Sequence, residues 1–179
     1  MGGFQLIDPL RFRAALGRFA SGVTVVSAHY QERTHGMTAS AFVSVSLEPP
    51  LVLVSLDNRS HMHRILPSAG RCGISVLDET QEQISNHFAG RAVEGIHFRF
   101  LTERGAPLLE GAVAHFVVEV MDAHPAGDHT LYIGRVEHFE ARDGRPLVFY
   151  AGQYQQLRAD GARPAAWPGD GFPCFCESW

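Results

Sequence analysis

The sequence of 179 residues is poor in cysteine: it has three, and two of them, Cys174 and Cys176, lie almost at its end. Such a set cannot build a disulfide framework, so we expect a reducing, cytoplasmic location. Two neighbouring cysteines without a second pair also fall short of a zinc site, so no metal is expected. No apolar run approaches the roughly 18 residues of a membrane span, and the N-terminus lacks the apolar stretch of a secretory signal.

Basic charge is not in surplus either. The formal net charge is −4, whereas nucleic-acid binders normally carry a basic excess or stripe, so no nucleic-acid partner is expected. The sequence contains neither the Gly-x-Gly-x-x-Gly fingerprint of a Rossmann domain nor the Gly-x-Ser-x-Gly elbow of a hydrolase. The composition, 45% apolar and 19% charged residues, is typical of a globular protein, and the length suits one domain.

Strands are predicted to outnumber helices. Helices are expected from Asp8-Pro9 onward, over 59–66, ending before Pro67, and over 79–88. Segments rich in β-branched or apolar residues predict strands over 23–30, 51–56, 72–77, 98–101, 112–121, 130–140 and 147–150. The late strands follow one another without helical crossovers, which favours a mainly β, antiparallel barrel over a doubly wound parallel sheet.

The segment from Met37 to Ser46 alternates almost strictly between apolar and hydroxyl-bearing residues. Period two predicts a single strand with one dry face, which includes Val43 and Val45, and one hydroxyl-lined face, interrupted by Phe42. Hydroxyls and main-chain N–H groups suit a phosphate or the polar edge of a flat heterocycle. Threonine and serine also simply suit a half-exposed strand.

Two further segments carry polar groups where an element begins. The segment 55–60 combines small polar residues with the start of a helix, whose first N–H groups favour an anion unless Asp57, Asn58 or Ser60 caps them. The segment 127–129, Gly-Asp-His, stands at the entrance to a strand. Its glycine permits an unusual turn, and its histidine can donate hydrogen bonds, although such a tripeptide is also an ordinary turn.

Six short motifs lie between about Phe12 and Tyr154, and their order along the chain indicates a family. They are FASGVTVV (19–26), MTASAF (37–42), SVSLEPPLV (44–52), FAG (88–90), GAPLLEG (105–111) and GDH (127–129). Taken in order, they resemble the flavin reductase family, the reductase partners of two-component flavin monooxygenases.

The resemblance implies an FMN-binding split β-barrel of antiparallel, Greek-key type that works as a homodimer, with the flavin near the subunit interface. It implies reduction of FMN or FAD by NADH or NADPH, and reduced flavin that diffuses to a partner monooxygenase. The residues that it assigns to the flavin are Met37, Thr38, Ala39, Ser40, Phe42, Ser55, Leu56, Asp57, Asn58, Ser60, Phe88 and Ala89. His129 would be the catalytic residue that meets the nicotinamide, aided by Tyr154. Members often place a basic residue near the phosphate, and both Arg59 and Arg64 are candidates.

We therefore expect one flavin reductase-like split-barrel domain over 1–157 and an irregular C-terminal extension over 158–179. Three other hypotheses stay open at this point. The chain could be a non-reductase flavin- or haem-binding protein on the same barrel, an enzyme like pyridoxamine-phosphate oxidase, or a structural subunit whose C-terminal tail binds a partner. Fold alone does not decide among them.

Overall fold

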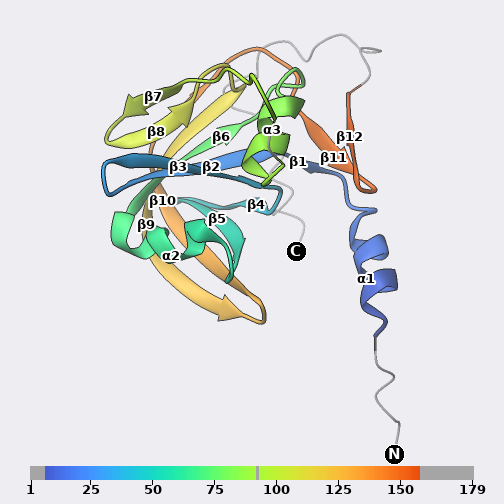
Figure 1. Cartoon of the computed structure of the whole chain (residues 1–179). Coiled ribbons are helices and arrows are strands. Elements are labelled where there is room, and N and C mark those ends of the chain that lie inside the picture. The colour runs from blue at the N-terminus through green and yellow to red at the C-terminus, as the bar shows by residue number, and fades with distance from the viewer. Residues whose placement is uncertain (1–6, 92, 158–179) are drawn as a thin grey trace, which may run out of the picture.

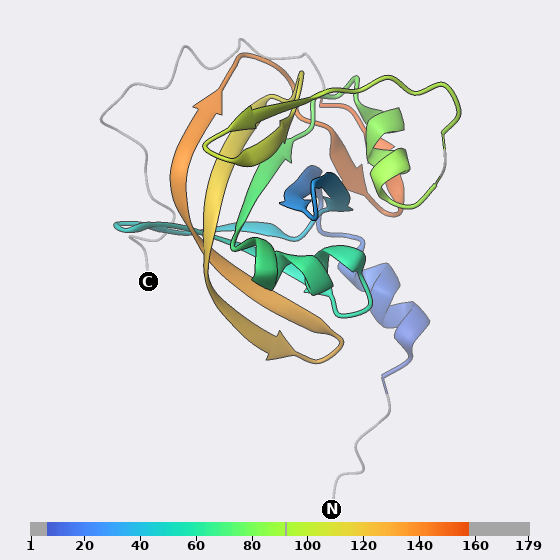
Figure 2. The ribbon, with the colours of Figure 1, turned by 60° about the vertical axis from the view of Figure 1, so that its left-hand side comes forward.

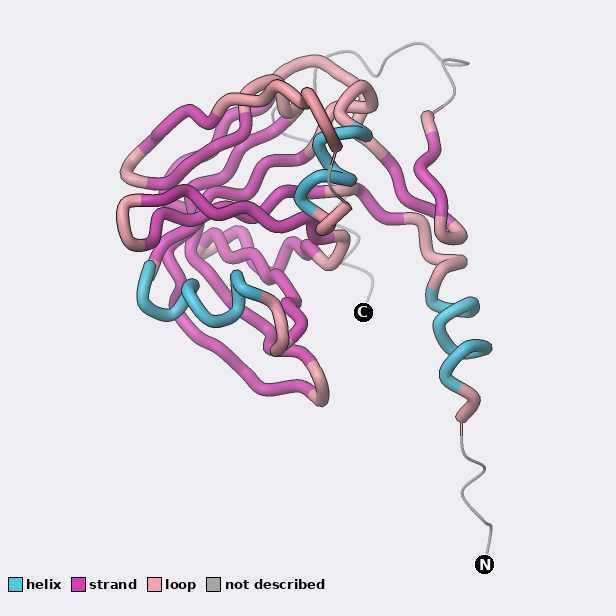
Figure 3. The backbone as a smooth tube through the Cα atoms, in the orientation of Figure 1, coloured by secondary structure: helices cyan, strands magenta, loops and turns pink. Residues whose placement is uncertain are grey.

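The computed structural model describes residues 7–91 and 93–157, and most of this part of the chain is β-strand (Figure 1 and Figure 3). Its helices are α1 (Pro9–Leu16), α2 (His61–Ala69) and α3 (Glu82–Phe88). Its strands are β1 (Ser21–Gly22), β2 (Thr24–Tyr30), β3 (Arg33–Ala39), β4 (Phe42–Leu47), β5 (Pro50–Asp57), β6 (Arg71–Val76), β7 (Phe100–Glu103), β8 (Ala106–Leu109), β9 (Ala114–Ala126), β10 (His129–Ala141), β11 (Val148–Tyr150) and β12 (Gln153–Gln155). The prediction of a mainly β protein with a few helices is confirmed.

Seven strands form one antiparallel sheet in the order β3-β2-β6-β9-β10-β5-β4. The sheet curls until β3, at one edge, contacts β5, next to the other edge (Figure 2). The long β9–β10 hairpin contains register shifts at Ile133/Gly134 and Val136/His138, and such bulges increase local twist. This curled antiparallel sheet is the barrel class that the strand pattern predicted.

Helix α2 packs against the curled sheet with one apolar stripe. Met62, Ile65 and Leu66 are spaced by three and four residues and are at most 2% exposed, so they join the main core with residues of β2, β5 and β6. The helix begins at the N-cap Ser60 and ends at Gly70, whose φ of 67° is left-handed.

The predicted end of this helix before Pro67 is wrong, because α2 continues to Ala69. Proline has no N–H, so the carbonyl four residues earlier, that of His63, loses its helical donor. The Tyr132 hydroxyl of β10 donates to this carbonyl oxygen at 3.2 Å and also lies 2.8 Å from His63 Nδ1. A distant tyrosine therefore replaces the missing bond and lets the helix run on.

The predicted single strand from Met37 to Ser46 is also wrong. It is divided into β3 and β4, which lie at opposite edges of the seven-stranded sheet. The chain crosses between the edges at Ser40-Ala41, where the Ala41 carbonyl accepts from the Ser55 N–H at 3.1 Å. The expected dry face fails in β4, since Val43 and Val45 are 52% and 47% exposed.

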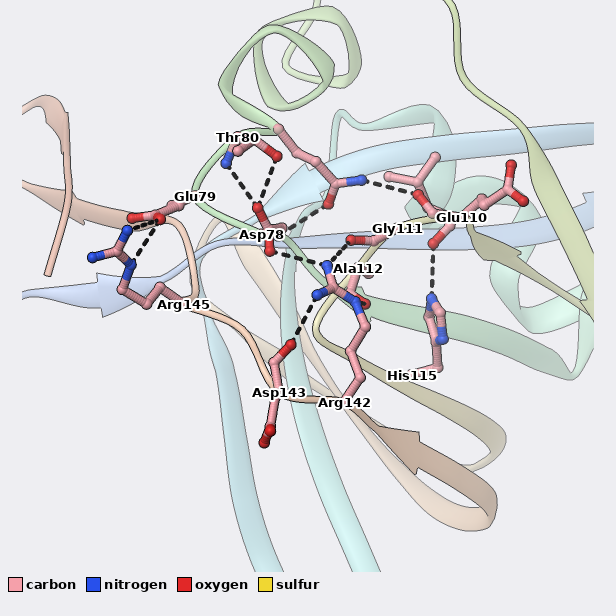
Figure 4. A network of polar contacts seen from close by, with 12 residues as sticks. Asp78, Glu79, Thr80, Glu110, Gly111, Ala112, His115, Arg142, Asp143 and Arg145 are labelled. Carbon is pink, nitrogen blue, oxygen red and sulfur yellow. Dashed lines mark hydrogen bonds and ion pairs between the residues drawn. The ribbon is translucent and has the colours of Figure 1, made fainter. Parts of the chain in front are cut away.

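Helix α3 begins three residues later than the predicted Glu79, because polar contacts fix the preceding segment (Figure 4). The Asp78 carboxylate accepts from the Thr80 N–H and hydroxyl at 3.0 and 2.7 Å, and from Arg142 at 2.9 Å. Arg145 donates to Glu79 at 2.7 Å. The start of α3 is thereby held against the chain that joins β10 to β11.

None of the helices in residues 7–91 and 93–157 is long and apolar enough to cross a membrane. The same residues contain no group of three or more His, Cys, Asp or Glu placed to hold a metal ion. The extension predicted over 158–179, with Cys174 and Cys176, lies outside the described residues. Cys72 is buried in the core, and burial raises the pKa of its thiol to about 12, so it is a packing residue.

Candidate functional site

The end of β5 and the start of α2 form the first part of the site. The Asp57 carboxylate accepts from the Arg59 N–H at 2.7 Å and pairs with the Arg59 guanidinium at 2.8 Å. These bonds hold the pKa of Asp57 far below its usual range. The Ser60 side chain accepts from the His63 N–H at 3.1 Å, so the capping alternative is confirmed for this residue. The other N–H groups of the first turn have no partner within the helix.

The Gly-Asp-His segment lies beside this loop. His129 opens β10 and is paired in register with Asp57 of β5. Gly127 has a φ of 65°, so it adopts the unusual turn that a glycine at this position permits. The His129 ring, 42% exposed, lies with Nδ1 2.7 Å from the Asp128 carboxylate, and this contact lowers the pKa of Asp128. The fold thus brings 55–60 and 127–129 together, although about 70 residues separate them in the sequence.

Strand β3 and helix α3 form the second part of the site. Thr38 donates its hydroxyl to the Ser85 carbonyl at 2.7 Å, and the Ser85 hydroxyl lies 2.8 Å from the Tyr154 hydroxyl. Phe88 lies directly on Gly36, where an added Cβ would be 2.7 Å from its ring. Sequence reasoning missed Ser85 and Gly36. Only the glycine, which directly precedes the strand predicted from Met37, could have signalled a close approach.

Phe88 also belongs to an aromatic cluster. Its ring centroid is 4.9 Å from that of Phe98 and 5.8 Å from that of Phe100, while Ala89 follows as the C-cap of α3. Phe98 and Phe100 stand in the stretch expected to be a strand, and nothing in their spacing linked them to residue 88. The cluster fixes one wall beside β3.

Helix α2 connects the two parts, because it contacts both β3 and β5. The His35 ring of β3 and the His61 ring, first in α2, have centroids 4.6 Å apart. Burial, then the charges of His61 and Arg33, lower the pKa of His35. Arg64 lies 3.4 Å from the His61 ring, whereas Arg59 is paired with Asp57.

Several predicted flavin residues are partly or wholly in the core. Leu56 and Ala39 are 0% and 7% exposed, so they can reach a ligand only through the main chain. Met37 and Phe42 pack against the main core, while Ser40 is exposed where the chain crosses between sheet edges. Tyr154 is apart from His129: β12 and the β9–β10 turn lie well separated in both Figure 1 and Figure 2.

Known proteins are similar to this chain over most of its length. The sequence model described as "Flavin reductase like domain" matches residues 16–158, most of the chain. The chain belongs to the flavin reductase-like family.

Individual relatives of this flavin reductase-like chain carry names that state an activity. An NADH-dependent flavin reductase of a Rhodococcus species is 53% identical over 154 residues, which cover 84% of this chain and 88% of the relative. The reductase component of 4-hydroxyphenylacetate 3-monooxygenase from Thermus thermophilus is 44% identical over 147 residues, 82% of this chain and 95% of the relative. The solved flavin reductase PheA2 is 38% identical with a TM-score of 0.83, and the match covers 85% of this chain and 99% of PheA2.

Proposed function

We propose that this chain catalyses the NADH-dependent reduction of a flavin, FMN or FAD, which then serves a partner monooxygenase. One observation carries the proposal: His129 at the start of β10 lies in register beside the Asp57 end of β5, next to the first turn of α2. A group that can contact a nicotinamide and a helix terminus that favours a phosphate are thereby adjacent. The relatives named above carry the matching activities.

The donor set fits a flavin. Ser60 and the first turn of α2 offer hydroxyl and N–H donors for a phosphate, and Arg64 is nearby on the same helix. The main chain of Thr38 to Ser40 is the proposed contact for the flavin edge, since the Thr38 hydroxyl is already given to Ser85. Phe88 and Ala89 supply the apolar wall.

Hydride transfer between a reduced nicotinamide and a flavin is chemistry that the two cofactors supply when bound. The chain's task is to hold the reacting atoms about 3–3.5 Å apart and to exclude water. Asp128 fixes the His129 ring through Nδ1, which leaves Nε2 for the nicotinamide carboxamide. His129 therefore orients the nicotinamide rather than transferring a proton.

The test is NADH and NADPH oxidation by purified protein, with and without FMN, FAD or riboflavin. We expect flavin-dependent NADH oxidation, and for His129→Ala an NADH KM raised by more than about fivefold, a loss of about 1 kcal/mol. Flavin binding without consumption of either nicotinamide would reject the reductase and favour a binding protein. Unchanged kinetics of His129→Ala would remove His129 from the site.

We further propose a homodimer in a reducing cytoplasm. Two apolar surfaces support it: Val43, Val45 and Leu47 on the edge strand β4 are 47–84% exposed, and α1 has no buried residue at all. Exposed apolar surface of this kind marks an interface. Val45→Glu should therefore yield a monomer in light-scattering chromatography, while Leu101→Glu, on the separate β7–β8 hairpin, should leave the assembly unchanged.

A further inference from the structure

Asn58 joins the two loops of the first part of the site. Its N–H donates to the Asp128 carbonyl at 3.0 Å, and its side-chain amide donates to the Gly127 carbonyl at 3.4 Å. Its Oδ1 accepts from the Thr130 hydroxyl at 2.8 Å. One residue after β5 thus bonds the residues on both sides of His129, about 70 positions away.

Strand pairing holds the two ends of the β9–β10 turn, where His129 is paired with Asp57 and Ala126, but the side chains of the turn itself make few contacts. A Cβ at Gly127 would meet nothing within 4 Å, and the Asp128 side chain is 85% exposed. The contact between Asp128 and His129 joins neighbours, so it orients the ring but does not anchor the turn. Thr130, in contrast, is 6% exposed and is fixed in the sheet. The bonds of Asn58 therefore tie the turn to a rigid neighbour.

We infer that Asn58 is a positioning residue for His129, and that its main effect is on the nicotinamide. This rests on the proposed function, and it differs from the flavin contact that the family resemblance implied for Asn58. The nitrogen and the oxygen of the Asn58 side-chain amide both form hydrogen bonds within the chain. Every bond of Asn58 described above reaches one of residues 127–130. Loss of the amide removes the bonds to Gly127 and Thr130 and leaves only the main-chain bond from the Asn58 N–H to the Asp128 carbonyl, so the turn is loosened and the His129 ring shifts. The capped start of α2 stays in place through Ser60.

The experiment compares Asn58→Ala, His129→Ala and the double variant in steady-state NADH and flavin kinetics. We expect Asn58→Ala to raise the NADH KM about fivefold, with flavin KM and the flavin Kd from fluorescence changed less than about twofold. In the His129→Ala background the same substitution should have no further effect on the NADH KM, because residues that act through one another are not additive.

Thr130→Val removes only the hydroxyl that donates to Asn58 and keeps the side-chain shape. It tests the same bond if the Asn58→Ala variant misfolds, and it should also raise the NADH KM. Asp122→Asn is the matched control: it breaks an ion pair with His124 on the same hairpin and should leave the kinetics unchanged. A raised flavin KM with an unchanged NADH KM would overturn the inference, as would an equal effect of Asn58→Ala with and without His129. An unmodified protein that consumes no NADH with any flavin would instead reject the proposed function itself.

Discussion

Tyr132→Phe tests how α2 passes through Pro67. The substitution removes one hydroxyl from a side chain that is 3% exposed, and with it the donor to the His63 carbonyl and the partner of His63 Nδ1. Because Pro67 supplies no N–H, the carbonyl is left without a donor. The ring and its packing are kept, so the change isolates the polar contacts.

The expected cost follows from these contacts. A buried acceptor left unsatisfied costs about 1–3 kcal/mol. The two contacts between Tyr132 and His63 are part-buried and both are lost, so we expect the free energy of unfolding to fall by about 2 kcal/mol. For a chain of this size the melting temperature should then fall by about 4–8 °C. Tyr150→Phe, at a tyrosine that is 37% exposed, is the matched control and should change stability by less than about 0.5 kcal/mol.

A second substitution sharpens the test. Pro67→Ala restores an N–H that can donate to His63, so it should stabilise the Tyr132→Phe variant by about 1 kcal/mol more than it stabilises the parent. The His63 ring stays unpaired, and the rescue is therefore partial. Urea unfolding of all four proteins gives the coupling free energy, and additivity within about 0.3 kcal/mol would refute the explanation of the continued helix.

Two other predictions concern the second part of the site and its neighbour. Tyr154→Phe leaves the buried Ser85 hydroxyl without its partner, so the free energy of unfolding should drop by about 1 kcal/mol in urea titrations; no change would mean that the bond contributes nothing. The pKa of His35 is lowered in the folded state by burial and by His61, so the unfolded chain binds more protons below about pH 6.5 and stability falls on acidification. His35→Gln should therefore lose less stability between pH 7.5 and pH 5.5 than the parent, and an equal loss would contradict this assignment.

Much of the element pattern is determined locally in the sequence. β-Branched and alternating segments specified the strands now seen as β2, β5, β6, β9 and β10, because side-chain period and propensity act over neighbouring residues. The N-cap role of Ser60 and the positive φ of Gly127 are local in the same way. The order of short motifs was enough to indicate the flavin reductase family, which the family match confirms.

Only the tertiary structure decided what depends on a distant partner. Alternation across 37–46, interrupted only at Phe42, concealed a crossing between sheet edges, since period two is the same whether a chain stays in one strand or enters another. The continuation of α2 past Pro67 required a hydroxyl from β10. The bond between Asn58 and Thr130 spans 72 positions, and no local rule connects residues that only the antiparallel pairing of β5 with β10 brings into contact.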